Sequence, residues 1–381
     1  MMKRRTLQTT LIVSIVISFL GFISLISFAT YQSKYWSSGN AVVDLADKII
    51  LSTVIVSTDT IDEKYKQEAA SRGLLGQGTG FFIEVTDTHA WVLTNHHVIE
   101  SYIKLGSNLL KLKVKAAGRP WGYDAELVGI DKVTDLAILK IAKKDNEEWT
   151  ALKWGDTWED AIEYGQAVLT VGHGLGQYWS VSKGVITGKD RITNAPFNFM
   201  IQHDAMINQG HSGGPLVNNK GEVIGVNTML LSPGKSWSGV SLAVVGWQAQ
   251  RSIDQIMKKG FVTYPEYDFT IDLVTLEEAQ KQDEFNKGDV KKRSYIKIAE
   301  VPKDGKAEEA GFKDNDIILK VDSNRAHHVV IWLENILGKE ADEVIAITVL
   351  RDFNQIIVLN YKLNRLDIKG LTPDIVPLYS N

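Results

Sequence analysis

Residues 207–218 read INQGHSGGPLVN, and residues 220–230, KGEVIGVNTML, follow almost at once. The pattern around Ser212, GHSGG, also fits the strand-to-helix turn of the α/β-hydrolases, in which a helix follows the serine and the acid and histidine come later in the chain. The residues after Ser212 instead predict a strand, a turn and a second strand. The later histidines, His327 and His328, fall in a separate region. The stretch therefore favours a β fold over the hydrolase alternative.

The same β pattern extends from about Ile49 to Val244. Many short strands with Gly, Asn and Asp between them, and almost no helical periodicity, predict a sandwich or a pair of barrels. An amphipathic helix is predicted over 247–259, with Gly260 as its C-terminal stop, and the first domain is expected to end there. Examples of the strand runs are IILSTVIVS (49–57), GTGFFIEV (78–85), AWVLT (90–94) and LAILKIA (136–142).

A second, smaller domain is predicted from about Tyr267 to Asp367. Helical runs over 276–285 and 329–337 alternate there with apolar strand-like runs, which is typical of one small α+β domain. The last residues, 368–381, are predicted to be a tail.

The N-terminus carries an uncharged apolar run from Leu11 to Ala29, preceded by Lys3, Arg4 and Arg5. A membrane span needs roughly 20 apolar residues, and basic residues before it stay on the cytoplasmic side, so the rest of the chain would be exported. A cleaved signal peptide is the alternative, with Ser27, Phe28 and Ala29 as the cleavage site. An uncleaved anchor is favoured because signal-peptide apolar regions usually run only about 7 to 15 residues.

Composition excludes several kinds of function. The 381 residues include 42 basic and 46 acidic residues, a net charge of −4, and show no dense basic stripe, so no nucleic-acid partner is expected. There is no cysteine, which excludes thiol nucleophiles and cysteine-ligated metals. The histidine pairs at 96–97 and 327–328 lack the spacing of a helical zinc site. Neither a metal nor a cofactor is predicted.

A serine hydroxyl is a weak nucleophile until a base accepts its proton. His211 is poorly placed to act on Ser212, because neighbours on a tight turn point in different directions. The segment VLTNHHVIE (92–100) places two histidines after an apolar strand, and Asp135 precedes another strand. The order His, Asp, Ser is that of the chymotrypsin-type proteases. In that chemistry the imidazole takes the serine proton, the carboxylate fixes its tautomer and backbone N–H groups hold the oxyanion.

Several motifs together resemble the HtrA (Deg) family, trypsin-like serine proteases with a C-terminal PDZ domain. The resemblance spans roughly Val54 to Leu363. It implies a mainly β fold: a chymotrypsin-like double β-barrel protease domain (36–260) and a small α+β PDZ domain (261–367), after an N-terminal transmembrane helix (1–35) and before the tail (368–381). The motifs are GQGTGFFI, LTNHHVI, TDLAILKI, GLGQYWSVSKGVIT, DAMINQGHSGGPLVN, GEVIGVNT and VPKDGKAEEAGFKDNDIILKVD, in family order.

The resemblance implies a role for each site residue. The family has a single histidine directly before the valine of this motif, which maps onto His97 as the base. Asp135 and Ser212 match the acid and the nucleophile. The oxyanion hole is assigned to the N–H groups of Gly210 and Ser212, with His211 between them.

Two histidines depart from the family pattern. Position 211 is usually Asn in the family, and His173, in GHGLG (172–176), stands where Asn-Pro is usual. These loops switch the oxyanion geometry in the family. A pH-sensitive switch through either imidazole is therefore a hypothesis.

The resemblance also suggests two binding sites. An apolar S1 pocket with walls from Ile207, Thr228 and Leu242 would favour small aliphatic side chains. PDZ domains bind extended C-termini by strand addition. The corresponding stretch here, YDFTID (267–272), has no glycine, and Asp268 is expected to repel a terminal carboxylate. A domain that only packs, without a ligand, is the alternative. The predicted peptide-binding residues are Tyr267, Asp268, Phe269 and Thr270.

The family branch that fits best is the anchored, single-PDZ, DegS-like one. It implies a periplasmic endopeptidase on the inner membrane that binds C-termini of unfolded proteins and cuts a membrane-bound regulator. It also implies a homotrimer held by the segment after the anchor, with Tyr31, Tyr35 and Trp36. General degradation of unfolded proteins is one alternative, and a catalytically silent, chaperone-like scaffold of the same fold is another.

Overall fold

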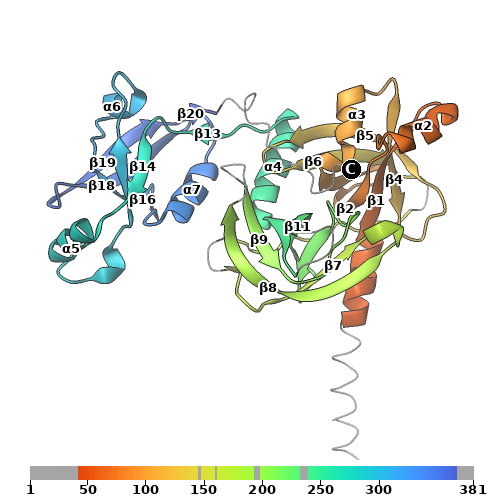
Figure 1. The fold of residues 1–381 in the computed structure, drawn as a ribbon, viewed down its shortest axis with the longest axis horizontal. Coiled ribbons are helices and arrows are strands. Elements are labelled where there is room, and N and C mark those ends of the chain that lie inside the picture. Colours follow the sequence, from red (N-terminus) through yellow and green to blue (C-terminus); the bar gives the residue numbers. More distant parts are fainter. Residues whose placement is uncertain (1–41, 145–146, 159–160, 193–197, 232–238, 367–381) are drawn as a thin grey trace, which may run out of the picture. The chain divides into compact units, whose positions relative to one another are not determined.

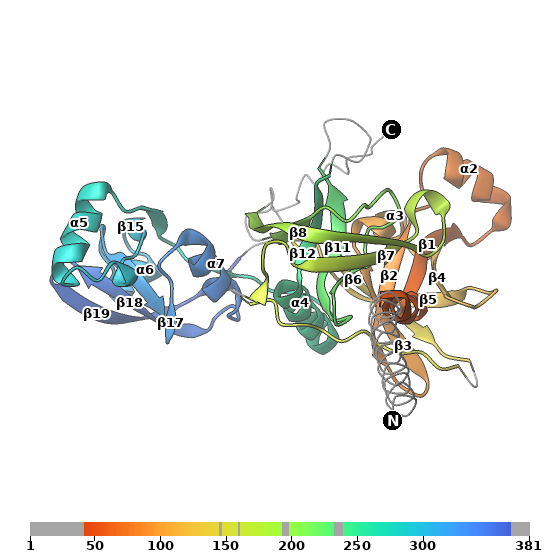
Figure 2. The same cartoon turned by 90° about the horizontal axis from the view of Figure 1, so that it is seen from below.

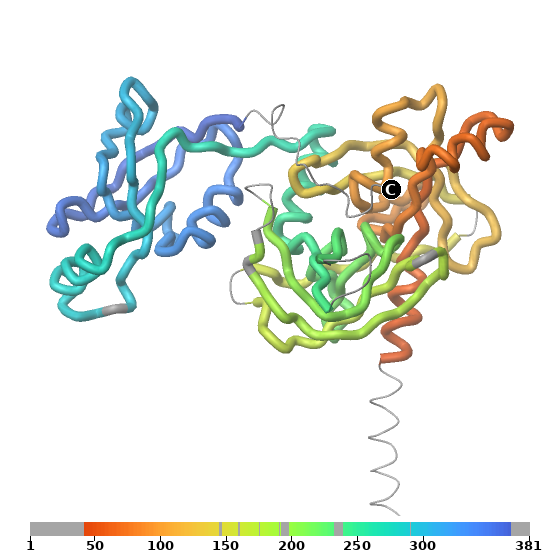
Figure 3. Tube along the Cα trace, in the orientation of Figure 1, coloured from red at the N-terminus to blue at the C-terminus, as the bar shows by residue number. Residues whose placement is uncertain are grey.

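The computed structural model describes residues 42–144, 147–158, 161–192, 198–231 and 239–366 (Figure 1; Figure 3 draws the other residues in grey). The predicted membrane segment, the three aromatic residues proposed for a trimer and the predicted tail lie outside the described residues. Among the helices that are described, none has the length and apolar character needed to cross a membrane.

Six antiparallel strands close into a first barrel, orange to yellow in Figure 1. Alternation of buried and partly exposed residues marks the strands as half-buried, most regularly over Leu110–Ala116. Two short helices, α2 (Lys66–Ser71) and α3 (Glu100–Leu105), connect strands of this barrel. In the order β1-β2-β3-β6-β5-β4, the strands are β1 (Thr53–Thr60), β2 (Gln77–Val85), β3 (His89–Asn95), β6 (Leu136–Ala142), β5 (Tyr123–Asp131) and β4 (Leu110–Ala116).

Six further strands close into a second barrel, green in Figures 1 and 2. The barrel closes where the first of these strands along the chain pairs with the fourth, with Thr170 opposite Leu216. In the order β10-β11-β12-β9-β8-β7, the strands are β10 (Pro215–Asn218), β11 (Val223–Leu230), β12 (Ser241–Val245), β9 (Phe199–His203), β8 (Ser180–Ile192) and β7 (Ala167–Gly172). The pair of barrels predicted from the sequence is therefore confirmed.

One predicted strand is partly wrong. Residues 42–52 are helical and β1 begins only at Thr53, so the first four residues of the run IILSTVIVS end a helix. The less exposed positions Leu45, Ile49 and Ser52 follow helical spacing. A short apolar run such as IILS does not distinguish helix from strand by periodicity alone.

Helix α4 (Gly246–Lys259) follows the second barrel and ends at Gly260, which has a left-handed φ of 80°. The helix contacts both barrels through polar side chains. The hydroxyl of Ser252 donates to the buried carboxylate of Asp131 at the end of β5, and the side-chain oxygen of Gln248 accepts from the N–H of Phe199 in β9. Both bonds are buried, so α4 fixes one end of each barrel relative to the other.

The C-terminal domain, blue in Figure 1, has a sheet in the order β14-β15-β16-β18-β19 and a core of aromatic rings around Phe269, Trp332 and Tyr361. Strand β14 lies at the edge of the sheet and pairs with β15. Both predicted helices form. The elements are β13 (Pro265–Glu266), β14 (Thr270–Leu273), α5 (Leu276–Phe285), β15 (Ile296–Glu300), α6 (Lys306–Ala310), β16 (Ile317–Val321), β17 (Asn324–Arg325), α7 (Val329–Leu337), β18 (Val344–Arg351), β19 (Gln355–Lys362) and β20 (Asn364–Arg365).

Candidate active site

The residues predicted to carry the chemistry meet at the seam between the two barrels. His97 begins a short 3₁₀ turn after β3, Asp135 precedes β6, and Ser212 lies in the turn before β10. A backbone hydrogen bond crosses the seam, from the N–H of Thr79 in β2 to the carbonyl of Ser212, at 2.8 Å. The first barrel thus supplies His97 and Asp135, and the second supplies Ser212.

His97 and Asp135 form a close pair. The ring Nδ1 of His97 is 2.5 Å from Oδ2 of Asp135, and the backbone N–H of His97 donates to Oδ1 at 2.9 Å. Because an ionised carboxylate only accepts, Nδ1 carries the proton and Nε2 keeps its lone pair. Asp135 is 1% exposed and has a left-handed φ of 58°, a conformation that Asp tolerates better than most residues. The carboxylate is therefore placed to fix the tautomer that a general base needs.

His96 is held differently. Its Nδ1 is 3.9 Å from Oδ1 of Asp135, beyond hydrogen-bond distance, and its backbone N–H donates to the carbonyl of Asp135 at 2.9 Å. Burial lowers the pKa of His96, and the charge of Asp135 offsets this only in part. His97, not His96, thus has the geometry of a carboxylate-oriented base.

Ser212 is bonded within the second barrel in this structure. Its Oγ donates to the carbonyl of Thr228 at 3.3 Å, and within the described part of the chain it makes no hydrogen bond to His97. The hydroxyl of Thr228 donates to the carbonyl of Val226 and accepts from the side chain of Asn95. Catalytic hydrogen bonds are often long or absent without substrate and tighten in the complex. Attack by Ser212 requires its hydroxyl to turn from Thr228 toward Nε2 of His97.

The turn before Ser212 leaves two N–H groups free. The carbonyl of Gly210 accepts from Oγ1 of Thr79 at 2.6 Å, and the N–H of His211 donates to the carbonyl of Asn208 at 3.0 Å. The N–H groups of Gly210 and Ser212 have no acceptor among the residues that the structure describes. Two unpaired donors beside the nucleophile are the arrangement that stabilises an oxyanion.

The ring of His211 packs against the loop that contains Gly172 and Gly174 and, within the described part of the chain, makes no hydrogen bond to Ser212. A Cβ atom at Gly172 would lie 2.5 Å from Cδ2 of His211, and one at Gly174 would lie 2.3 Å from Cε1, so the ring fills space that both glycines leave open. Its Nδ1 is 3.2 Å from the carbonyl oxygen of Asn208. Burial lowers the pKa of His211. His211 therefore packs the turn from outside, as the position of its backbone had suggested.

His173 is 1% exposed, and its Nδ1 accepts from the backbone N–H of Trp179 at 3.1 Å. Burial lowers the pKa of His173 to about 4. The imidazole is thus neutral throughout the physiological pH range. The hypothesis of a physiological pH switch finds no support at His173.

We expect the acid limb of kcat/KM to report His97. Burial alone would lower the pKa of His97, but the charge of Asp135 and its hydrogen bond outweigh burial, so the pKa lies above the ordinary 6.5. Only the neutral imidazole accepts the serine proton, so activity should fall as pH drops through a single ionisation above 6.5. Peptide hydrolysis measured across pH 5 to 9, about two units either side of neutrality, checks this. If the acid limb of kcat/KM shifts in His211→Asn, the ionisation belongs to His211 and the assignment to His97 is wrong.

We expect His173 to make the fold acid-sensitive. Its folded pKa of about 4 lies below the ordinary 6.5, so between these values the unfolded chain takes up a proton that the folded chain does not. The corresponding stability is present above pH 6.5 and is lost as pH falls toward about 4. At pH 5 the loss is about 2 kcal/mol.

Urea unfolding of the unmodified chain and of His173→Asn at pH 7.5 and 5.0, about 1 unit above and 1.5 below 6.5, measures this contribution. The unmodified chain should lose more stability than the variant between the two conditions. His203, whose pKa burial also lowers to about 4, is present in both proteins and cancels. An equal loss in both proteins would contradict the assignment to His173.

The residues predicted to line S1 are placed around β11 and β12. Ile207 and Leu242 are buried, at 4% and 2% exposure. The hydroxyl of Thr228 is already bonded within the fold, so this residue faces the nucleophile through its backbone carbonyl.

The four residues predicted to bind peptide in the C-terminal domain do not all face its open edge. Phe269 is 3% exposed in the aromatic core and Tyr267 packs against it, whereas Thr270 begins the edge strand β14. The expectation that Asp268 repels a terminal carboxylate stays a prediction, because the groups that donate to Asp268 are uncharged and leave its negative charge in place. Its Oδ1 accepts from the hydroxyl of Tyr361 and its Oδ2 from the N–H of Lys306, each at 2.8 Å.

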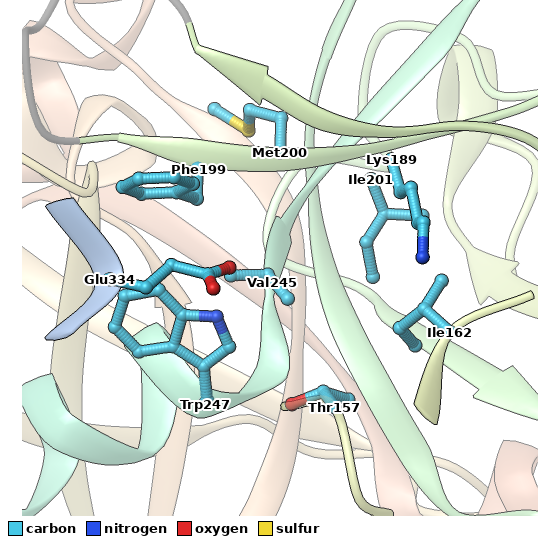
Figure 4. Close-up of a pocket in the computed structure, with 9 residues that line it drawn as sticks. All are labelled: Thr157, Ile162, Lys189, Phe199, Met200, Ile201, Val245, Trp247 and Glu334. Carbon is cyan, nitrogen blue, oxygen red and sulfur yellow. The ribbon is translucent and has the colours of Figure 1, made fainter. Parts of the chain in front are cut away.

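The cavity drawn in Figure 4 is unrelated to these residues. Its volume of about 10 Å³ is close to the lower limit for one water molecule, so it is too small for a substrate. It is lined by Thr157, Ile162, Lys189, Phe199, Met200, Ile201, Val245, Trp247 and Glu334 (Figure 4).

Two polar residues at the seam were not predicted. Thr79 holds the turn of the oxyanion donors, and Asn95 is fully buried with its side-chain N–H₂ group on both the carbonyl of Asp135 and the hydroxyl of Thr228. Their partners lie up to 133 positions away in the chain. No local sequence pattern marks such contacts.

Comparison with known proteins agrees with this geometry. A family profile described as a trypsin-like peptidase domain matches residues 78–226. A probable periplasmic serine endoprotease, DegP-like, from Chlamydia trachomatis is 33% identical over 245 residues, 64% of this chain and 45% of its own length. A serine protease Do-like HtrA from Lactobacillus helveticus is 32% identical over 72% of this chain and 66% of its own.

A solved structure, the HtrA-type protease AlgW with tripeptide, superposes with a TM-score of 0.66 at 25% identity, covering 85% of this chain and 97% of that one. The chain spans about half the length of the first curated relatives it matches, 45% in the case of the Chlamydia trachomatis protein.

The paired barrels define the chymotrypsin-like class of serine peptidases. Within that class, matches to HtrA proteases recur in both the sequence and the structure comparisons. The chain belongs to the HtrA family of serine proteases.

Proposed function

We propose that this chain is a serine endopeptidase whose catalytic groups are His97, Asp135 and Ser212. The observation that carries the proposal is the His97–Asp135 pair, in which the carboxylate accepts from both the ring Nδ1 and the backbone N–H of the histidine. This leaves Nε2 of His97 as the one ring nitrogen able to accept a proton. Two free N–H groups, on Gly210 and Ser212, complete the constellation.

The proposed reaction follows from these positions. Oγ of Ser212 bonds to the scissile carbonyl carbon while its proton passes to Nε2 of His97, and the N–H groups of Gly210 and Ser212 hold the oxyanion. The C–N bond then breaks as His97 returns the proton to the leaving amine. Water, activated by His97, hydrolyses the acyl-serine. Asp135 stays ionised throughout and stabilises the imidazolium.

The test is labelling with a fluorophosphonate probe, read by intact mass, on the full chain with and without peptides ending in aromatic or aliphatic residues. One adduct on Ser212 that is lost in His97→Ala supports the peptidase. Absence of an adduct under every peptide and at raised temperature would overturn it.

A catalytically silent scaffold is the second candidate, and one observation favours it. The hydroxyl of Ser212 donates to Thr228 and not to the base. In a scaffold this arrangement would persist in the presence of peptide, whereas in a peptidase it is the resting state. Labelling separates the two, because the phosphonylation reaction needs both a free hydroxyl and a base.

We further propose that the C-terminal domain is a PDZ domain that regulates cleavage. Strand β14 is an edge strand, and an extended peptide adds to such an edge through main-chain hydrogen bonds. Both carboxylate oxygens of Asp268 are bonded inside the domain, to the hydroxyl of Tyr361 and the backbone N–H of Lys306, so this side chain is held in one place beside the strand. Calorimetry with a peptide acid and its C-terminal amide tests the mode of binding: a carboxylate-reading site prefers the acid.

The wider role is proposed from the family. The Chlamydia trachomatis relative, which is named as periplasmic, supports a periplasmic protease, and the family resemblance supports a role in protein quality control or stress signalling. The apolar run at 11–29 supports tethering to the inner membrane, and the homotrimer of the DegS-like branch is part of the same proposal. The intact mass of the membrane-extracted chain distinguishes an anchor from a cleaved signal, and light scattering gives the oligomeric state. Substrates with small aliphatic residues before the cut are expected for the S1 walls of Ile207 and Leu242.

A further inference from the structure

Thr79 lies in β2 and is fully buried, at 0% exposure. All of its polar groups are bonded. Its N–H donates to the carbonyl of Ser212 at 2.8 Å, its hydroxyl donates to the carbonyl of Gly210 at 2.6 Å, and its own carbonyl accepts from Oγ1 of Thr94 at 2.7 Å. One residue of the first barrel thus holds two carbonyls of the turn that belongs to the second.

The hydroxyl of Thr79 has a defined direction. The backbone N–H of His173 lies 3.2 Å from Oγ1 and can only donate, whereas the Gly210 carbonyl can only accept. Oγ1 therefore accepts from His173 and donates to Gly210. Such a chain of hydrogen bonds polarises each member. The loop that carries His173 is in this way connected to the oxyanion turn.

The hydrogen bond from Thr79 to the Gly210 carbonyl holds the peptide that follows the N–H of Gly210, one of the two proposed oxyanion donors. Gly210 has a φ of 102°, and a Cβ atom there would lie 2.4 Å from the carbonyl oxygen of His173. This conformation turns the N–H of Gly210 away from every acceptor in the described structure. A glycine has little intrinsic preference for such a φ, so contacts must hold it. The carbonyl end of Gly210 is held by Thr79, and the next N–H, of His211, by Asn208.

We propose that Thr79 is a positioning residue for the peptidase reaction: its hydroxyl fixes the Gly210 carbonyl and so keeps the N–H groups of Gly210 and Ser212 directed at the oxyanion. This inference rests on the nucleophile and oxyanion assignments proposed above. Without the hydroxyl, the partly buried carbonyl of Gly210 loses its donor, and the peptide between Gly210 and His211 is less firmly held in its orientation. A misplacement of about 1 Å at a reacting group costs about 10²-fold in rate.

A packing role for Thr79 makes the opposite prediction. Its methyl group faces Gly214, where a Cβ atom would be 3.1 Å from Cγ2. Valine keeps the methyl group and replaces the hydroxyl with a second methyl, whereas serine keeps the hydroxyl and removes the methyl. If Thr79 only packs, valine is tolerated and serine is damaging. If it positions the turn, the order is reversed.

The experiment measures kcat and KM for a fluorogenic peptide, and the Ki of a matching peptide boronic acid, whose adduct with Ser212 mimics the oxyanion. Active-site titration corrects for unfolded protein. For Thr79→Val we expect kcat to fall about 10²-fold with KM unchanged, and Ki to rise in parallel. Thr79→Ser should stay within a few-fold of the unmodified chain. The matched control is Thr58→Val, because Thr58 is also a buried threonine of the first barrel, bonded to the N–H of Gly76 and remote from the turn.

Either an unchanged kcat in Thr79→Val or an equal loss in Thr79→Ser overturns the inference. If Thr79→Val fails to fold, the comparison of Thr79→Ser with Thr79→Ala carries the test, since only serine keeps the donor. Activity that survives Ser212→Ala would overturn the proposed function itself. Activity lost in Ser212→Ala but kept in Thr79→Val would overturn only the role of Thr79.

Discussion

Ser212→Ala is expected to lower kcat for peptide hydrolysis by about 10⁶-fold. The reason is that the other hydroxyls described at the seam, those of Thr79 and Thr228, are already bonded within the fold, so the covalent step has no substitute nucleophile. Because the Ser212 hydroxyl donates only to Thr228 at 3.3 Å, its loss removes one weak hydrogen bond and should leave the fold intact. Steady-state kinetics together with circular dichroism measure both effects.

Ser71→Ala is the matched control for this substitution. Ser71 ends α2 on an exposed surface and donates to the carbonyl of Glu68, so both variants lose one serine hydroxyl of modest structural value. Its kcat should equal that of the unmodified chain. Residual activity in Ser212→Ala above about 1% would point to a different nucleophile.

Asp135→Asn is expected to lower kcat by about 10⁴-fold. An amide donates to Nδ1 of His97, which places the ring proton on Nε2, where a lone pair is needed. The charge that raises the pKa of His97 is lost as well, so the acid limb of kcat/KM should move to lower pH. Kinetics across pH detect both the lower rate and the moved limb.

The control for the acid is Asp124→Asn, which changes a carboxylate on the surface of the same barrel that pairs with Lys113. It should change neither kcat nor the pH profile. If the acid limb of kcat/KM lies at the same pH in Asp135→Asn as in the unmodified chain, Asp135 does not set the basicity of His97.

Much of the fold follows from local patterns. The strands of both barrels are short, contain alternating apolar residues and are separated by turn residues. Helix α4 ends where Gly260 predicted its end, because glycine adopts the left-handed conformation at little cost. The helical IILS run was misassigned because three apolar residues and a serine fit either period.

The sequence predicts the reactive residues of the site but not the contacts that hold them in place. Motifs near His97, Asp135 and Ser212 carry the residue types, and chain order alone suggested their roles. The supporting contacts of Thr79 and Asn95 join positions more than 130 apart, and only the folded seam brings them together. The contacts of Asp268 could not be predicted for the same reason, since Tyr361, which donates to it, lies 93 positions further along.

The division of the catalytic groups between the barrels also orders events during synthesis. The ribosome makes the chain from its N-terminus, so the strands that carry His97 and Asp135 are complete before Ser212 has been added. The second barrel closes only when β10, which follows the nucleophile, pairs with β7. With the roles proposed above, a nascent chain has His97 and Asp135 in place while it still lacks Ser212 and the N–H groups of its turn. The proposed catalytic groups therefore come together only when the second barrel forms.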